Sequence, residues 1–271
     1  MSRDSTTNQT YVAGMSLGRG SSPDRFQIED VPRGSYNLLY EEGGRWAATA
    51  IEVRERDLED VTLVLRPGED LAGRIVVTGA TNAIPLEKLT VIAGGRYAIP
   101  GLDGSFTLRD LQGSLSTRVD GLPPDAYVAD IRQGSRSLYD TARTLEGPQI
   151  EVGNSTESLQ IVVNPNGGVI EGAIERNNQT VVLGARVVLV PAASRRFVLT
   201  YYKTALANER GEFSFRGIAP GVYQIFAWES VPDTAWLNPE FMASYEGRGQ
   251  TVAIDSGGRL NARVRLIPRT D

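Results

Sequence analysis

The chain contains no histidine and no cysteine, and this limits the chemistry that its side chains can perform. Histidine is the commonest general base and metal ligand, while cysteine supplies thiolate nucleophiles, thiolate metal ligands and disulfides. The stretch Gly14–Gly18 matches the G-x-S-x-G nucleophile elbow, but that motif needs a histidine partner and a strand-to-helix turn. We therefore expect a protein without enzymatic activity, catalytic residues, a metal ion or a cofactor.

Paired carboxylates are the main catalytic chemistry that remains possible without histidine. Glu229 and Glu240 flank Trp236 in one stretch, and they are the best candidates for a glycosidase pair. A solvated acidic loop explains the same residues, and we favour that interpretation. The acidic turns at 102–104 and 208–211 lack the alternating oxygen ligands of a calcium loop and are typical of hairpin turns.

Aromatic side chains gather in one stretch and form the candidate ligand-binding site: Trp228, Trp236, Phe241 and Tyr245. Exposed rings in a loop at the edge of a β-sandwich could bind sugar rings or a side chain of a protein partner. Alternatively, Trp228 continues a strand into the interior and Trp236 covers the core beneath its own loop. The sequence leaves both interpretations open.

The stretch Gly211–Glu229, which precedes these aromatics, predicts a strand, a tight turn and a second strand. Phe213 and Phe215 are two residues apart, so a pleated strand places both on one face. Pro220-Gly221 predicts a type II turn, in which glycine takes the positive φ. The alternation then restarts at Tyr223, and together these features predict a β-hairpin.

The same pattern occurs twice more in the chain. Phe26, Ile28, Val31 and Tyr36 match Phe213, Phe215, Ile218 and Tyr223 at constant spacing. A third copy is split into Phe106, Leu108, Leu111 and Leu122, Pro123, Tyr127, with room for an extra strand at Ser114–Val119. A second unit closes each copy with a strand that ends at proline: 58–68, 158–167 and 259–268. This recurrence predicts a tandem array of three β-modules, in which the recurring tyrosines are structural.

The repeats divide the chain into 1–67, 68–165 and 166–271. The second and third modules each open with a strand that has a central glycine, LAGRIVV (71–77) and VIEGAI (169–174). The first module has no such opening strand. Either its first strands lie outside this sequence, or its open edge pairs with something else. With about seven short strands per module, the fold class is predicted to be all-β, with antiparallel β-sandwiches.

The first module is expected to contain strands at Tyr11–Leu17, Trp46–Val53 and Val61–Leu65, besides the hairpin that begins at Phe26. In the third module, the proline of Asn238-Pro239-Glu240 can occupy a first helical position behind a capping asparagine. We expect a short helical turn there.

Charge and hydropathy restrict the partners. The net charge is −5 and no basic run occurs, which argues against nucleic-acid binding. No apolar run approaches the ~18–20 residues that span a bilayer, so we expect no membrane insertion by this chain. The polar first residues lack the apolar core of a signal peptide. The oligomeric state does not follow from the sequence.

Taken together, the residues of the third copy resemble the carboxypeptidase regulatory-like domains, which belong to a transthyretin-like (prealbumin-like) group of β-sandwiches that includes the Cna-B type. The residues that carry this resemblance are Gly211, Phe213, Phe215, Gly217, Pro220, Gly221 and Tyr223. The resemblance implies a non-catalytic structural or interaction module of a larger bacterial surface or extracytoplasmic protein. It also implies two alternatives: a carbohydrate-binding module, or an accessory domain that positions a peptidase or an outer-membrane receptor. The expected partner is a protein or a polysaccharide.

Some residues depart from the family pattern. Arg33 stands at the position of Pro220 in the first copy, and Asp125 at the position of Gly221 in the second, so these turns are expected to differ in type. Some Cna-B domains close a lysine–asparagine isopeptide bond from the first strand. The opening strands of this chain carry Arg74 or no basic residue, and arginine cannot replace lysine in that condensation. We expect no internal crosslink.

Overall fold

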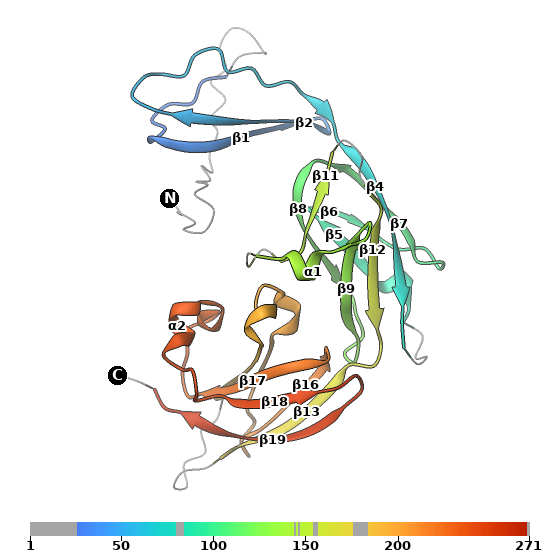
Figure 1. Cartoon of the computed structure of the whole chain (residues 1–271), viewed down its shortest axis with the longest axis vertical. Coiled ribbons are helices and arrows are strands. Elements are labelled where there is room, and N and C mark those ends of the chain that lie inside the picture. Colours follow the sequence, from blue (N-terminus) through green and yellow to red (C-terminus); the bar gives the residue numbers. More distant parts are fainter. Residues whose placement is uncertain are drawn as a thin grey trace. The chain divides into compact units, whose positions relative to one another are not determined.

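The computed structural model describes residues 26–79, 84–143, 145, 147–153, 157–175 and 184–269 (Figure 1). The chain forms two compact units, Met1–Glu69 and Asp70–Asp271, which are described separately. The strand expected at Tyr11–Leu17 and the G-x-S-x-G match at Gly14–Gly18 lie outside the described residues. Within the described part, no helix is long and apolar enough to cross a bilayer.

The described part of the first unit contains one small antiparallel sheet, β1 (Gly34–Glu42), β2 (Arg45–Val53) and β3 (Arg66–Pro67). Gly43 and Gly44 take φ of +58° and +76° in the two-residue turn between β1 and β2, as hairpins with this twist require. The strand expected at Trp46–Val53 is confirmed as β2. The strand expected at Val61–Leu65 and the hairpin arm expected at Phe26–Ile28 are wrong, because neither stretch belongs to a sheet.

The first part of the second unit is a two-layer β-sandwich. One sheet has the order β10-β9-β12-β4-β7 and the other has the order β11-β8-β5-β6. A single apolar core lies between the two sheets. The elements are β4 (Glu69–Val77), η1 (Leu86–Lys88), β5 (Thr90–Ala93), β6 (Arg96–Ala98), β7 (Ser105–Leu111), β8 (Gly113–Asp120), β9 (Tyr127–Gln133), β10 (Arg136–Ser137), α1 (Leu138–Thr141), β11 (Gln149–Val152) and β12 (Leu159–Asn164). The extra strand expected at Ser114–Val119 is confirmed as β8.

The second part of this unit contains a second β-sandwich. Its strands follow the order β15-β14-β17-β19-β13-β16, and β18 pairs with β17. The elements are β13 (Gly168–Glu175), β14 (Arg186–Pro191), η2 (Ala193–Arg195), η3 (Leu199–Tyr201), β15 (Lys203–Leu206), β16 (Glu212–Ile218), β17 (Gly221–Trp228), η4 (Ala235–Leu237), α2 (Pro239–Ala243), β18 (Gln250–Ile254) and β19 (Arg259–Ile267). The all-β sandwich class is confirmed, although the sheets are mixed rather than purely antiparallel. The helical turn behind Asn238 is also confirmed: the Asn238 side chain accepts from the backbone N–H of Glu240.

The hairpin predicted for Gly211–Glu229 is wrong, although both of its strands exist. β16 pairs with β13, whereas β17 pairs with β14, β18 and β19, so the chain turns a corner between two layers. Gly221 takes φ of +156° rather than the roughly +80° of a type II turn. The Tyr223 hydroxyl donates to the carbonyl of Ala219 (2.8 Å) and holds this corner. Period-two alternation predicts the two strands but carries no information on which sheet each one joins.

The opening and closing strands of each sandwich lie side by side and parallel. Gly73 of β4 is opposite Leu159 of β12. Gly172 of β13 is opposite Ala262 of β19. A Cβ atom at Gly73 would clash with the Phe106 ring and lie 2.9 Å from the Leu159 carbonyl oxygen. A Cβ atom at Gly172 would likewise clash with the Phe213 ring and lie 2.8 Å from the Ala262 carbonyl oxygen. Glycine is required at both positions because the ring and the neighbouring backbone fill the space of a side chain.

Candidate functional site

The aromatic residues predicted to bind a ligand come together beside β17 and α2. The Trp228 ring stacks on Phe226 at 5.2 Å between centroids and meets the edge of Tyr245 at 5.6 Å. The ring centroids of Phe241 and Tyr245 lie 4.9 Å apart. Trp236 belongs to the same apolar cluster, and the Arg186 guanidinium lies over its ring at 5.6 Å. The structure thus gathers all four predicted residues in one cluster.

Burial decides how these rings can act. Trp228 is 1% exposed and Trp236 is 7% exposed, whereas Phe241 and Tyr245 are half-buried. The two indole rings therefore pack inside a small core, and a ligand could reach only parts of Phe241 and Tyr245. The Trp228 indole N–H is buried and has no hydrogen-bond acceptor among the described residues. A ligand-binding role for this cluster stays a prediction, and the burial favours the alternative in which the cluster supports its own loop.

The carboxylates around Trp236 do not form a recognisable catalytic pair. Glu229 and Glu240 are both exposed, and the Glu229 carboxylate accepts a hydrogen bond from the Arg269 backbone N–H (3.1 Å). Among the described residues, no group of three or more aspartates and glutamates could hold a metal ion. This arrangement is that of solvated surface carboxylates.

The second candidate site is the junction between the two sandwiches of the second unit, and the sequence did not predict it. The Asp125 carboxylate accepts two hydrogen bonds from Arg216, from Nε (2.7 Å) and from Nη2 (2.9 Å). The Asp125 carbonyl accepts from the backbone N–H of Gly167 (2.7 Å). Such two-pronged arginine–carboxylate pairing fixes orientation as well as distance. Asp125, which stands at the Gly221 position of the repeat, thus joins the two sandwiches.

Two glycines make this junction close-packed. Gly217 takes φ of +62°, and a Cβ atom there would lie 2.5 Å from the Pro124 carbonyl oxygen and 2.8 Å from that of Ala126. A Cβ atom at Gly167 would lie 2.5 Å from the Cα of Gly217. Tyr127, at the start of β9, is buried within the apolar core of the following sandwich. The two sandwiches therefore meet through backbone and core, without a spacer between them.

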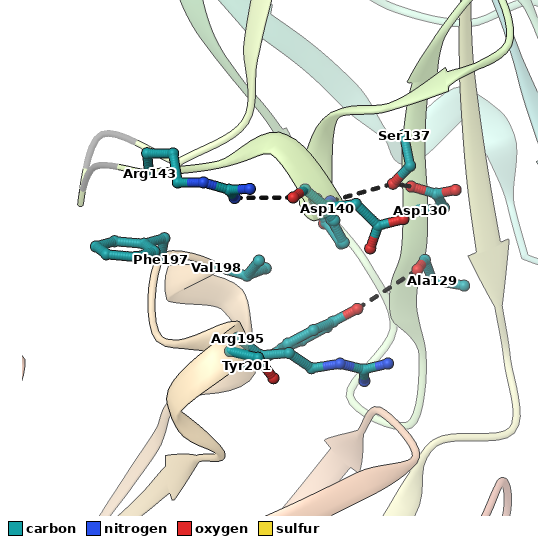
Figure 2. A pocket seen from close by; sticks show the side chains of 11 residues that line it. Ala129, Asp130, Ser137, Asp140, Arg143, Arg195, Phe197, Val198 and Tyr201 are labelled. Carbon is teal, nitrogen blue, oxygen red and sulfur yellow. Dashed lines mark hydrogen bonds between the residues drawn. The ribbon is translucent and has the colours of Figure 1, made fainter.

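A cavity of about 580 Å³ lies beside this junction. Figure 2 shows Asp140 and Arg143 of the α1 segment facing Arg195, Phe197 and Val198 of the η2–η3 segment. The Tyr201 hydroxyl donates to the Ala129 carbonyl (3.4 Å) and links the two sides.

Three charged side chains of this cavity, Asp130, Arg143 and Arg195, form hydrogen bonds within the chain. The Asp130 carboxylate accepts from Ser137 (2.7 Å) and from Arg132 (2.6 Å). The Arg143 guanidinium donates to the Asp140 carbonyl (2.8 Å). The Arg195 guanidinium donates to the Pro220 carbonyl (2.9 Å). No sequence motif marks the cavity, because its walls come from segments far apart in the chain.

Two tyrosines, Tyr201, which is buried, and Tyr139, which is half-buried, contact each other across the junction and make it sensitive to alkaline pH. The rings of Tyr139 and Tyr201 meet edge to face at 5.5 Å. Burial raises the pKa of the Tyr201 hydroxyl to about 12, and burial also raises the pKa of Tyr139. Both hydroxyls therefore stay protonated in the folded chain at pH values where they ionise in the unfolded chain.

We expect the free energy of unfolding to fall as the pH rises from about 10 towards 12. The pKa values of the two tyrosines in the folded state lie above those in the unfolded state. Their contribution to the free energy of unfolding is therefore complete below about pH 10 and is lost as the pH rises above it. Each such tyrosine adds up to about 1.4 kcal/mol per pH unit to the slope. Urea denaturation at a series of pH values measures the slope of the free energy of unfolding against pH. Tyr201→Phe should flatten the slope and Tyr97→Phe, at a 71% exposed site, should not; equal slopes in all three proteins would contradict the expectation.

Comparisons with known proteins place the chain near no established family. No family model matches it, so the carboxypeptidase regulatory-like assignment is not confirmed, and no curated protein matches. Several similar solved structures are pilins. The minor pilin GBS52 of Streptococcus agalactiae is 9% identical with a TM-score of 0.30, over 75% of this chain and 98% of that one. A streptococcal ancillary pilin is 11% identical with a TM-score of 0.28, over 88% of this chain and 77% of that one.

The TIE protein of Bacillus anthracis is 12% identical with a TM-score of 0.26, over 82% of this chain. The match spans only 41% of the length of that protein. TM-scores and identities this low establish no shared activity.

Proposed function

We propose that the chain is a non-catalytic spacer segment of a larger bacterial extracytoplasmic protein. It consists of three carboxypeptidase regulatory-like modules at 1–67, 68–165 and 166–271, and its last two modules are held in one fixed orientation. Its partners are proteins rather than polysaccharides, because the predicted sugar-stacking rings are mostly buried. The extracytoplasmic location follows from the family resemblance alone.

The observation that carries this proposal is the junction between the last two modules. A flexible linker would leave exposed polar residues between two independent cores. In this chain the Asp125–Arg216 pair, the Gly167 hydrogen bond and the burial of Tyr127 in the neighbouring core lock one module onto the next. Relative motion is the usual behaviour across small inter-domain interfaces, whereas a two-pronged arginine–carboxylate pair and close backbone contacts favour one orientation.

Distance measurements between spin labels test this rigidity in the whole chain. Because the chain has no cysteine, Thr107→Cys and Ala253→Cys place labels only at two exposed positions, one in each of the last two modules. We expect a single narrow distance distribution by double electron–electron resonance.

A matched control sets the width that the labels themselves produce. Glu209→Cys and Ala253→Cys place both labels within the third module at exposed sites. An inter-module distribution as narrow as this control supports the rigid spacer. A distribution that is several times broader, or that has more than one maximum, would rule it out.

A further inference from the structure

The sequence contains one asparagine–glycine pair, Asn166-Gly167, and it lies in the junction between the last two modules. An asparagine before glycine is the most reactive kind in proteins, because glycine has no side chain to hinder attack on the asparagine carboxamide. Asn164 cannot react in this way, because the proline that follows it has no N–H to deprotonate. Asn166 is therefore the residue of this linking segment that can modify itself.

The two polar groups of the peptide that joins Asn166 to Gly167 are both held. The Gly167 N–H donates to the Asp125 carbonyl of the second module (2.7 Å). The Asn166 carbonyl accepts from the backbone N–H of Gly257 (2.7 Å) and from the Ser256 hydroxyl (3.1 Å), both of the third module. Because a peptide group is planar, these contacts fix its orientation. The peptide can turn only when the contact with Asp125 across the junction is broken.

The fold restrains the attacking nitrogen and leaves the attacked carbon unrestrained. Gly167 is buried, and its N–H donates to a carbonyl, which cannot take up a proton. Asn166 is half-buried, and its carboxamide forms no hydrogen bond with a described residue. Cyclisation therefore depends on release of the Gly167 nitrogen, which requires opening of the junction.

The packing of the junction explains why glycine follows Asn166. A Cβ atom at position 167 would lie 2.5 Å from the Asp125 carbonyl oxygen and 2.5 Å from the Cα of Gly217. Glycine is required there, so the close contact that joins the two modules also creates the reactive dipeptide. A reaction at this dipeptide acts on the junction itself.

We propose that Asn166 is a self-modification site: the closed junction prevents its deamidation, and deamidation after opening keeps the junction open. In the open state the Gly167 nitrogen loses its proton and forms a bond with Asn166 Cγ, while the bond between Cγ and Nδ2 breaks and ammonia leaves. Water then opens the cyclic imide at either carbonyl and gives aspartate or isoaspartate. The inference goes beyond the proposed spacer but rests on the same junction.

The isoaspartate product opposes closure by its geometry. It carries the main chain through its side chain, which adds one methylene group to the backbone before Gly167. The Gly167 N–H then no longer reaches the Asp125 carbonyl while the Asn166 carbonyl position is held by Ser256 and Gly257. A junction matched to within hydrogen-bond distance has no room for this extra length.

Peptide mapping by mass spectrometry, during incubation at neutral pH, measures conversion at position 166 in the whole chain. A synthetic peptide of residues 160–172, QIVVNPNGGVIEG, gives the rate without the junction. We expect conversion in the chain to be at least about tenfold slower, because a reaction in a locally opened state follows the population of that state.

Variants at the junction separate local opening from global unfolding. Gly217→Val should raise the rate at position 166 by about fivefold or more, because a Cβ atom at 217 would meet the Pro124 carbonyl oxygen at 2.5 Å. Gly247→Val, which has a comparable positive φ but no such contact, should leave the rate unchanged. The milder Arg216→Gln removes the exposed pair with Asp125 and should raise the rate about two- to fivefold.

Spin labels at positions 107 and 253 test whether the product holds the junction open. Chains that carry isoaspartate at 166 should give a broad distance distribution. The variant Asn166→Gln, incubated for the same time, should keep a narrow one, because glutamine cyclises far more slowly than asparagine.

Equal rates in the chain and in the peptide, or equal rates in the Gly217→Val and Gly247→Val variants, would overturn the protective role of the junction. A narrow distribution in chains with isoaspartate at 166 would overturn the second part of the proposal. A distribution that is already broad before incubation contradicts the rigid spacer instead, so the two failures are distinguishable.

Discussion

Trp228→Ala is expected to lower the free energy of unfolding by about 3–5 kcal/mol, the usual cost of removing a fully buried large aromatic side chain. Trp228 is 1% exposed, stacks on Phe226 and contacts Tyr245, so its loss leaves a cavity between β17 and α2. Urea denaturation followed by circular dichroism measures the change.

Two variants control for this result. Trp228→Phe should lower the free energy of unfolding much less, because it keeps a ring in place and removes an indole N–H that has no acceptor in the described part of the chain. Leu206→Ala, at a 61% exposed position, should change stability by no more than about 0.5 kcal/mol. If instead Trp228→Ala kept full stability and abolished a fluorescence response to a polysaccharide, a carbohydrate-binding role for the aromatic cluster would replace its role as a core.

Gly217→Val is expected to broaden the spin-label distance distribution between the last two modules and to lower stability. Any side chain at φ of +62° costs about 1–2 kcal/mol. A Cβ atom at this position would also lie 2.5 Å from the Pro124 carbonyl oxygen, so the modules must separate. Spin labels at positions 107 and 253 report the change in distance between the two modules directly.

Gly247→Val provides the matched comparison for that variant. Gly247 takes φ of +85°, yet a Cβ atom there meets nothing within 4 Å. This variant therefore carries the backbone cost without the contact between modules, and its distance distribution should stay narrow. Equal broadening in the two variants would show that the close approach of Gly217 does not hold the junction.

The sequence was informative about strands and poor at assigning partners to them. The alternation at Phe213 and Phe215 and at Tyr223 predicts β16 and β17 correctly, because period two follows from the pleat of a single strand. Pairing depends on residues far away in the chain, and so the hairpin was wrong. The strand predicted at Val61–Leu65 is wrong for a related reason: a strand forms only where a neighbour completes its hydrogen bonds, and this stretch pairs with no strand among the described residues.

The candidate sites differ in how far the sequence could have indicated them. Their closeness in the sequence is enough to predict that four aromatic residues cluster: Trp228, Trp236, Phe241 and Tyr245. Their burial depends on how α2 packs over β17, and the local sequence does not predict that packing. The sequence marks Asp125 as a charged residue at a glycine position of the repeat, but it predicts only a different turn there and not a contact. Its partner Arg216 lies 91 residues away, so the pair itself appears only in the structure.

The parallel pairing of first and last strands has a mechanical consequence. In the third module the ladder runs from Val169–Arg259 to Glu175–Arg265, and the chain enters at one end of the ladder and leaves at the other. Tension on the two ends of the module therefore acts along these strands in opposite directions. All the rungs of the ladder bear the load together in shear, instead of opening one after another as in a hairpin. A module built in this way transmits pulling force without lengthening until the whole ladder fails at once.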